Sequence, residues 1–179
     1  VPHVSAILLC YNCADLVAAA VRSLLAQEYA GPVEVIISDD ASSDGTFAVA
    51  CRELAGCRAD WTVRTFQRAA NSGSKSAHLN DVLPRATGDI LISFDADDMS
   101  EPTRIRKTVA VFEADPLVQA VYSSFSLIDR DGHPLGTGHV PHPPSNVSTQ
   151  RWFARVDAYA AGATLAIRRP VLDVFGQLE

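Results

Sequence analysis

The sequence has no long hydrophobic run and no cluster of basic residues. Its apolar stretches, such as residues 6–10 and 90–94, are far shorter than the roughly 20 residues of a membrane-spanning helix. The 15 Lys and Arg residues are outnumbered by 21 Asp and Glu residues, and the formal net charge is −6. Binding to a nucleic-acid backbone needs clustered cations. We therefore expect no nucleic-acid partner and no transmembrane segment in this chain, and a divalent metal to offset the acidity if a phosphate compound binds.

The chain also lacks the marks of secretion. No basic segment precedes an apolar run at its N-terminus, which is the pattern of a signal peptide. The four cysteines are Cys10, Cys13, Cys51 and Cys57, and a chain of 179 residues has a core large enough to fold without a disulfide framework. Although Cys10 and Cys13 form a C-x-x-C pair, the spacing of the other two does not fit a zinc or redox pattern. We expect free thiols and a cytoplasmic protein.

Short apolar segments alternate with segments in which apolar residues recur near every 3.6 positions. The predicted strands are residues 4–10, 33–38, 61–66, 89–94 and 118–127, and the predicted helices lie within residues 15–30, 46–55, 76–85 and 103–114. Continuous apolar strands that alternate with helices are typical of a buried parallel sheet. The sequence thus predicts an α/β fold with a mostly parallel central sheet flanked by helices. No repeat or linker divides it, so we expect a single domain over residues 1–179.

Residues 131–145 are rich in Gly, Pro and His and form the longest predicted loop. A long loop without secondary structure is usually a functional lid or a mobile segment. Its histidines, His133, His139 and His142, are either metal ligands or simply exposed. Trp152 and Phe153, which follow it, are either a platform for an acceptor sugar or part of the core.

Polar clusters follow three of the predicted strands, at the end of a parallel sheet where ligands gather. They are Tyr11 with Asn12, Asp39 and Asp40 with Asp44, and Asp95 with Asp97 and Asp98. Three carboxylates within four residues repel one another unless a cation lies between them. Mg²⁺ and Mn²⁺ bind one or two carboxylates together with water and phosphate oxygens. The third cluster therefore indicates a divalent metal with a diphosphate ligand, and a solvated acidic turn is the alternative.

The other polar residues suit a nucleotide. Asp39 or Asp40 either caps a helix or accepts a hydrogen bond from a base or ribose, and Tyr11 offers an aromatic face to a base or packs at the rim of the core. Asn71 and Lys75 belong to a Gly-containing turn before a predicted helix, an arrangement that suits an anion. This turn lacks the P-loop spacing.

Taken in order, these segments closely resemble the family 2 glycosyltransferases of the GT-A fold. The matching segments are residues 4–12, 23–27, 35–46, 71–80, 86–91 and 95–98, with Pro102. The resemblance is continuous over about residues 1–115, which it implies to be the nucleotide-sugar-binding part. Residues 116–179 would begin the acceptor-side part. Each motif is weak alone, but the ordered set is specific.

The resemblance implies a Rossmann-like GT-A enzyme that uses Mn²⁺ or Mg²⁺ to bind a nucleotide-sugar donor, with a UDP-sugar favoured. Asp97 would be the direct metal ligand and Asp95 would lie nearer the ribose. Tyr11 and Asp40 would hold the base, with Asp39 as a substitute for Asp40. The sugar would pass with inversion to a hydroxyl of a glycan or lipid-linked acceptor in polysaccharide biosynthesis, in the cytoplasm or at the inner face of the membrane.

Two departures from the family pattern bear on function. Leu9 and Cys10 stand where many members have Pro-Thr or Pro-Ser. The family's general base follows a Gly-x-x-Glu motif that resembles residues 176–179, so we expect the base beyond Glu179 and donor binding with poor transfer. A GT-A-like module that binds nucleotide or glycan without turnover is the alternative. A haloacid-dehalogenase-like phosphatase, with Asp95 as nucleophile, does not fit because its motif lies on the first strand.

Overall fold

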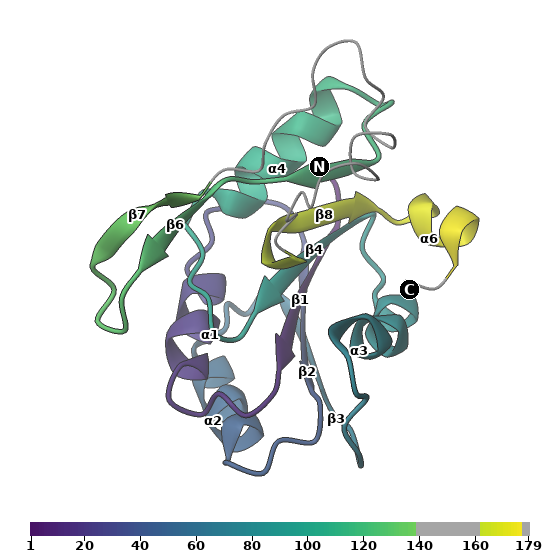
Figure 1. The fold of residues 1–179 in the computed structure, drawn as a ribbon. Coiled ribbons are helices and arrows are strands. Elements are labelled where there is room, and N and C mark those ends of the chain that lie inside the picture. The colour runs from purple at the N-terminus through teal and green to yellow at the C-terminus, as the bar shows by residue number, and fades with distance from the viewer. Residues whose placement is uncertain (139–161, 177–179) are drawn as a thin grey trace, which may run out of the picture.

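The computed structural model describes residues 1–138 and 162–176. Its main sheet has six strands in the order β3-β2-β1-β4-β8-β5. The strands β1 (Val4–Cys10), β2 (Val33–Asp39), β3 (Thr62–Gln67) and β4 (Ile90–Asp95) are parallel. The short strand β8 (Leu165–Arg168) is antiparallel to both β4 and β5 (Ala120–Tyr122). The predicted α/β fold with a mostly parallel central sheet is confirmed (Figure 1).

Helices cover both faces of this sheet. The helices α1 (Val17–Leu25), α2 (Thr46–Glu53) and α4 (Arg104–Ala114) pack on one face, and α3 (Lys75–Val82) and α6 (Pro170–Phe175) on the other. Three short 3₁₀ turns complete the order: η1 (Leu54–Gly56), η2 (Leu83–Arg85) and η3 (Gly162–Thr164). Figure 1 shows α1 and α2 together on one side of the sheet and α3 on the opposite side.

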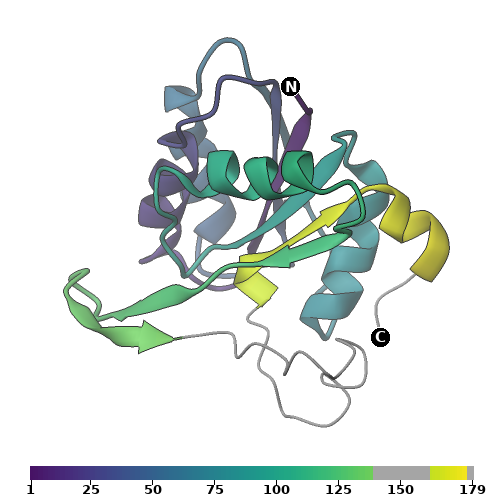
Figure 2. The ribbon, with the colours of Figure 1, turned by 90° about the horizontal axis from the view of Figure 1, so that it is seen from above.

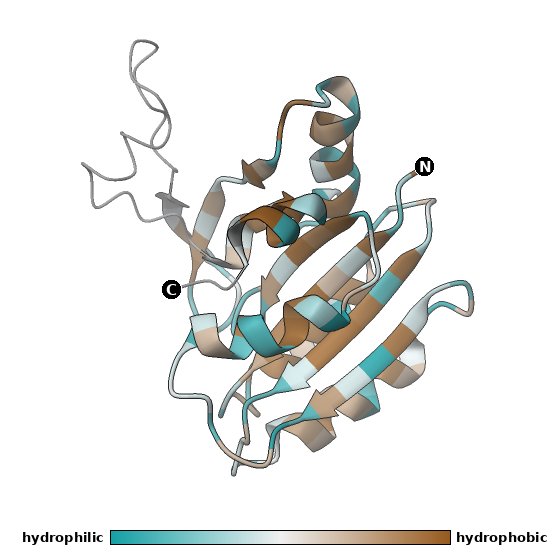
Figure 3. Ribbon diagram, turned by 90° about the vertical axis from the view of Figure 1, so that its right-hand side faces the viewer, coloured by the Kyte–Doolittle hydropathy of each residue, from teal (hydrophilic) through white to brown (hydrophobic). Residues whose placement is uncertain are grey.

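The central strands are apolar throughout because both of their faces are buried. Along β1, Ala6 and Leu8 face the core shared with α1, α2 and α4, whereas Ile7 and Leu9 face the core shared with α3. Every residue of β1 and β2 is buried. The hydropathy colouring of Figure 3 shows the same apolar strands at the centre of the sheet. This two-sided burial fixes where each strand ends, and so places the polar residues that follow.

The region after α4 differs from the sequence prediction. The single strand predicted over residues 118–127 is wrong, because the structure divides it into β5 and a separate strand β6 (Phe125–Ile128). Part of the predicted loop over residues 131–145 is also a strand: β7 (Pro134–Gly138) pairs with β6 in a two-stranded sheet. Gly132 takes a positive φ of 86° in the turn between them. This hairpin projects from the body of the molecule (Figure 2).

The cysteines and the lengths of the helices were also subjects of prediction. All four cysteines are unpaired. Within residues 1–138 and 162–176, none of the helices has the length and apolar character needed to cross a bilayer. His139, His142, Trp152 and Phe153 lie outside the described residues.

Candidate functional site

An open cleft of about 1580 Å³ lies beyond the carboxyl ends of β1 and β4. Its walls come from the loop after β1, the loop after β4, the start of α4, the β6 hairpin and η3. Asn12, Lys75, Asp95, Asp97 and Asp98 are among the residues that line it. Asp44 lines it as well, so the structure brings part of each of the three polar clusters, and Lys75 from the Gly-containing turn, to one cavity.

The acidic cluster lies in this cleft. One carboxylate oxygen from each of Asp95, Asp97 and Asp98 lies within 4.8 Å of the other two. The loop that carries them is fixed to the sheet, because Ala96 donates its backbone N–H to the carbonyl of Leu9 at 3.1 Å. Desolvation raises the pKa of Asp98, and the neighbouring charges of Asp97 and Asp95 raise it further. The cluster thus concentrates negative charge at one point of the cleft.

Lys75 supplies the cation next to this cluster. Its ammonium group forms an ion pair with both carboxylate oxygens of Asp95. Lys75 is the first residue of α3, and the Ser74 side chain caps that helix by accepting the Ala77 N–H at 3.1 Å. Gly73 allows the sharp turn before the cap with a φ of 84°. The helix start therefore presents the positive charge of Lys75 to the acidic loop.

Asp40 and Asn71 meet beside the cleft rather than in its lining. The Asp40 carboxylate accepts hydrogen bonds from the Ser72 N–H at 2.8 Å, the Ser72 hydroxyl at 2.6 Å and the Asn71 amide at 3.1 Å. Arg68 adds an ion pair at 3.1 Å. Asp40 is only 5% exposed. A nucleotide base that binds to Asp40 must therefore displace one of these protein donors.

Asp39 is fully buried and holds the turn that follows β2. It accepts hydrogen bonds from the Ser42 N–H at 2.9 Å and the Ser42 hydroxyl at 2.5 Å, and a longer one from Gln67 at 3.3 Å. Ser42 in turn accepts the N–H of Asn12 at 2.9 Å. Asp39 thus ties the loop after β2 to the loop after β1, while the neighbouring Tyr11 ring is 52% exposed.

Two groups near the site were not singled out from the sequence. Arg104 lines the cleft and stacks over Phe94, with its guanidinium 4.3 Å from the ring centroid. His78 is buried against the Ser38 hydroxyl, with 2.8 Å between Nε2 and Oγ, and burial lowers its pKa. Arg104 belongs to no motif with a chemical signature, and His78 lies within the matching residues 71–80 without a role of its own there, so spacing alone did not mark them.

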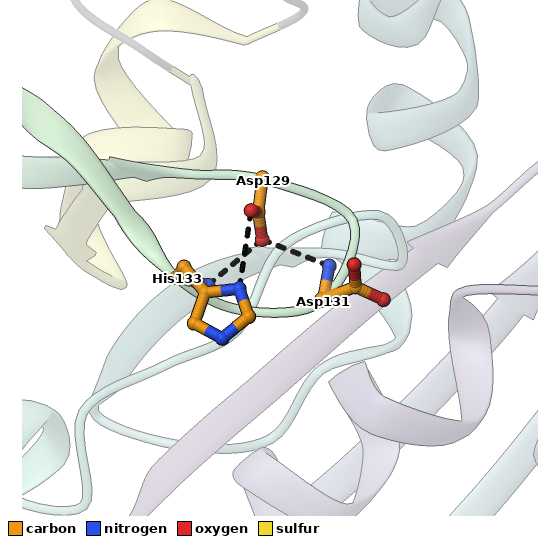
Figure 4. A group of neighbouring side chains, drawn as sticks. All are labelled: Asp129, Asp131 and His133. Atoms are coloured by element: carbon orange, nitrogen blue, oxygen red, sulfur yellow. Dashed lines mark hydrogen bonds and ion pairs between the residues drawn. The ribbon is translucent and has the colours of Figure 1, made fainter.

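A second cluster lies on the β6–β7 turn, where Asp129, Asp131 and His133 come together (Figure 4). The Asp129 carboxylate accepts the N–H groups of Asp131 at 2.9 Å and His133 at 2.8 Å, and contacts the His133 ring at 3.2 Å. These bonds lower the pKa of Asp129, chiefly through the His133 N–H. The exposed carboxylate thus has a local role in shaping the turn.

The family model described as "Glycosyl transferase family 2" matches residues 5–176. The chain belongs to glycosyltransferase family 2. The Bacillus subtilis protein EpsE is similar to this family 2 chain, with 37% identity over 131 residues that cover 73% of this chain and 46% of EpsE. The chain thus spans less than half the length of that relative.

Solved structures show the same fold as this family 2 chain. The mannosyltransferase PcManGT from Pyrobaculum calidifontis, in complex with GDP-Man and Mn²⁺, aligns with a TM-score of 0.70 and 24% identity over 99% of this chain and 48% of its own. TarS from S. aureus in complex with UDP-GlcNAc aligns with a TM-score of 0.64 and 18% identity over 96% of this chain and 46% of its own. The GT-A fold expected from the sequence is confirmed.

Proposed function

We propose that this chain is the donor-binding part of a glycosyltransferase that uses a nucleotide-diphospho-sugar and a divalent metal. The observation that carries the proposal is the acidic cluster in the cleft, with Asp95, Asp97 and Asp98 at the carboxyl end of β4 and Lys75 opposite. The donor is a UDP-sugar, the sugar nucleotide that the family resemblance favours. The alignment with PcManGT, whose complex holds GDP-Man, makes a GDP-sugar the competitor to test.

The residues present fit Mn²⁺ or Mg²⁺. Oxygen atoms are the ligands that these hard cations prefer, and both ions usually combine one or two carboxylates with water and phosphate oxygens. The cluster offers three carboxylates whose oxygens lie within 4.8 Å of one another, and Asp97 and Asp98 are exposed. In our proposal Asp97 is the direct ligand and Asp95 serves both the metal and the ribose. The bound metal would neutralise charge on the departing nucleoside diphosphate.

The other side chains bind and orient the donor. Tyr11 offers its exposed ring to the base, and Asp40 accepts a base N–H, with Asp39 holding the shape of the turn beside it. Asn71 orients Asp40, and its position at the start of the turn before α3 keeps that turn close to the nucleotide. Lys75 turns from Asp95 toward a donor phosphate, since a charge-assisted contact to phosphate replaces the ion pair.

The acceptor in this proposal is a hydroxyl of a glycan or of a lipid-linked sugar, and transfer proceeds with inversion. In this proposal the acceptor enters from the side of η3 and the β6 hairpin, which also line the cleft. We place the reaction in the cytoplasm or at the inner face of the membrane, in the synthesis of a polysaccharide.

Release of nucleoside diphosphate tests the enzymatic part of this proposal. The protein is incubated with UDP-sugars and GDP-mannose in Mn²⁺ and in EDTA, and free UDP and GDP are measured. We expect slow release from UDP-sugars, in line with the poor transfer expected from the sequence, that depends on Mn²⁺ and falls in Asp97→Asn. Release that is unchanged in EDTA would contradict the metal assignment.

A binding module without turnover is the second candidate. The observation in its favour is that Asp40 and Asp95 are both occupied by protein partners, Ser72 and Lys75. Metal-dependent nucleotide binding without any release of nucleoside diphosphate would favour this module over the enzyme.

A further inference from the structure

The guanidinium of Arg104 lies where three segments of the cleft meet. Its Nη2 donates to the Ser93 carbonyl at 2.6 Å, near the end of β4, and to the Ala163 carbonyl at 2.5 Å, in η3. Its Nη1 donates to the Ser100 hydroxyl at 3.2 Å, in the loop after the acidic cluster. One side chain therefore joins the strand that carries Asp95 to η3, which lies 59 residues after Arg104 in the chain.

The backbone ladder of the sheet ends before this junction, so a side chain makes the connection. The ladder between β4 and β8 ends at the pair of Ile92 and Ala166. Beyond that pair, β4 continues toward Asp95, while the other strand gives way to η3. The carbonyls of Ser93 and Ala163 lie just past the last ladder pair, and Arg104 bridges them. The Arg104 guanidinium thus connects β4 to η3 beyond the last ladder pair, up to the edge of the cleft.

The surroundings of Arg104 keep its side chain in one position. The guanidinium stacks on Phe94 at 4.3 Å, and Arg104 is the first residue of α4, whose next residue, Ile105, is fully buried. Burial lowers the pKa of Arg104 to about 10, and the charges of Asp95 and Asp98 oppose that shift. The side chain is therefore still a cation at neutral pH, placed behind the acidic cluster.

We propose that Arg104 is a positioning residue that holds η3 against the end of β4 and so fixes the opening between the acidic cluster and the opposite wall of the cleft. The role in transfer rests on the function proposed above, because metal-bound donor and acceptor would meet across that opening. Reaction rates depend steeply on such placement, and an error of about 1 Å can cost on the order of 100-fold. Arg104 itself touches neither donor nor acceptor in this proposal.

The test uses Arg104→Lys, which keeps the charge but loses the planar fork that reaches two carbonyls. Arg106→Lys is the matched control, because Arg106 is exposed on the same helix. Hydrogen exchange of the amides of residues 163–168 is measured together with thermal unfolding, the Kd of UDP in Mn²⁺, and the kcat and donor KM for release of UDP. We expect exchange in this segment to rise about tenfold in Arg104→Lys and to stay unchanged in the control.

For the same variant we expect kcat to fall about 30-fold, with the Kd and donor KM within about threefold of the original protein. A purely structural role would lower the fraction of folded protein and would move the Kd and kcat together. The inference is overturned if the exchange of residues 163–168 is unchanged, or if it rises while kcat stays the same. Failure of the original protein to bind any nucleotide would instead reject the proposed function, and the exchange measurement would still show whether Arg104 holds η3.

Discussion

Lys75 occupies a carboxylate that the proposed metal would also need. In the structure, the Lys75 ammonium contacts both oxygens of Asp95, so it neutralises the acidic cluster from within the protein. In our proposal, a donor bound with its metal would give each charge a new partner, because the carboxylates would hold the metal and Lys75 would contact a phosphate oxygen. Donor and metal binding would then be coupled through one side chain.

This coupling predicts opposite effects of Lys75→Met on the two ligands. Without nucleotide, the affinity for Mn²⁺ should rise about three- to fivefold, because an exposed ion pair contributes up to about 1 kcal/mol. The affinity for UDP in saturating Mn²⁺ should fall about tenfold or more, because a charge-assisted hydrogen bond is lost. Calorimetry measures both, with Lys107→Met as the control from the same cleft. A parallel loss of both affinities would contradict the exchange of partners.

Glu34 is a buried carboxylate whose role is structural. It is 2% exposed and accepts hydrogen bonds from the Ser5 hydroxyl at 2.7 Å, the Thr87 N–H at 2.8 Å and Arg64 at 3.0 Å. Burial by itself raises the pKa of Glu34, but these hydrogen bonds outweigh it and hold the pKa below its ordinary value. The charged form is thus favoured in the folded state.

Glu34→Gln should lower the free energy of unfolding by about 2–3 kcal/mol at pH 7, because it leaves buried donors poorly matched. Since the folded pKa is depressed, the contribution of Glu34 is complete above its ordinary pKa and is lost as the pH falls through the folded value. Urea unfolding from pH 7 to pH 3 should therefore show a flatter decline in the variant than in the original protein. Glu28→Gln, the same substitution at an exposed glutamate, is the control and should show no such change.

At the scale of elements, Gly88 fixes how β4 enters the sheet. Its N–H donates to the Ser5 hydroxyl at 2.8 Å, and a Cβ atom there would lie 2.4 Å from the Ser5 backbone nitrogen. Only glycine, which has no Cβ atom, fits this close to the backbone of β1. The residue therefore sets the register of β4 against β1, and with it the position of the acidic cluster.

Gly88→Ala should lower the free energy of unfolding by about 2–3 kcal/mol, because the backbone of β1 must move to admit a methyl group. Gly56→Ala is the matched control, since a Cβ at Gly56 meets nothing within 4 Å. The control should stay within about 0.5 kcal/mol of the original protein in the same urea titration. Equal stability of the two variants would show that β4 has room to shift.

The strands β1, β2, β3 and β4 lie within two residues of their predicted bounds. Three of them, β1, β2 and β4, are buried on both faces, and their apolar runs between polar turns leave little choice, whereas β3 is partly exposed. The polar residues of the site follow directly from these strand ends. Asp95, Asp97, Asp98 and Lys75 all line the cleft, and their roles in binding metal and donor stay predictions.

The elements that the sequence missed depend on contacts between distant segments. The β6–β7 hairpin was not predicted because its exposed residues lack the alternation of a half-buried strand. Arg104 gave no signal, because a lone Arg at a helix start is usually a surface residue. Its importance comes from the carbonyls of Ser93 and Ala163, which only the folded chain brings together.

At the scale of the whole molecule, the proposed function requires a protein with a net charge of −6 to bind an anionic donor. The acidic residues that line the cleft outnumber its basic residues, Lys75, Arg104, Lys107 and Arg130, and three of the carboxylates lie within 4.8 Å of one another. This arrangement favours a ligand that arrives with a divalent cation. We therefore expect EDTA to remove nearly all nucleotide affinity, rather than to weaken it slightly.

The most direct test of this account is calorimetric titration of the protein with UDP and GDP, each with and without Mn²⁺, repeated on Asp97→Ala. Asp131→Ala is the matched control, because it removes a carboxylate from the second acidic cluster, on the hairpin turn. The account predicts UDP binding that requires Mn²⁺, disappears in Asp97→Ala and persists in Asp131→Ala. Nucleotide binding that is equally strong without metal, or unchanged in Asp97→Ala, would contradict it.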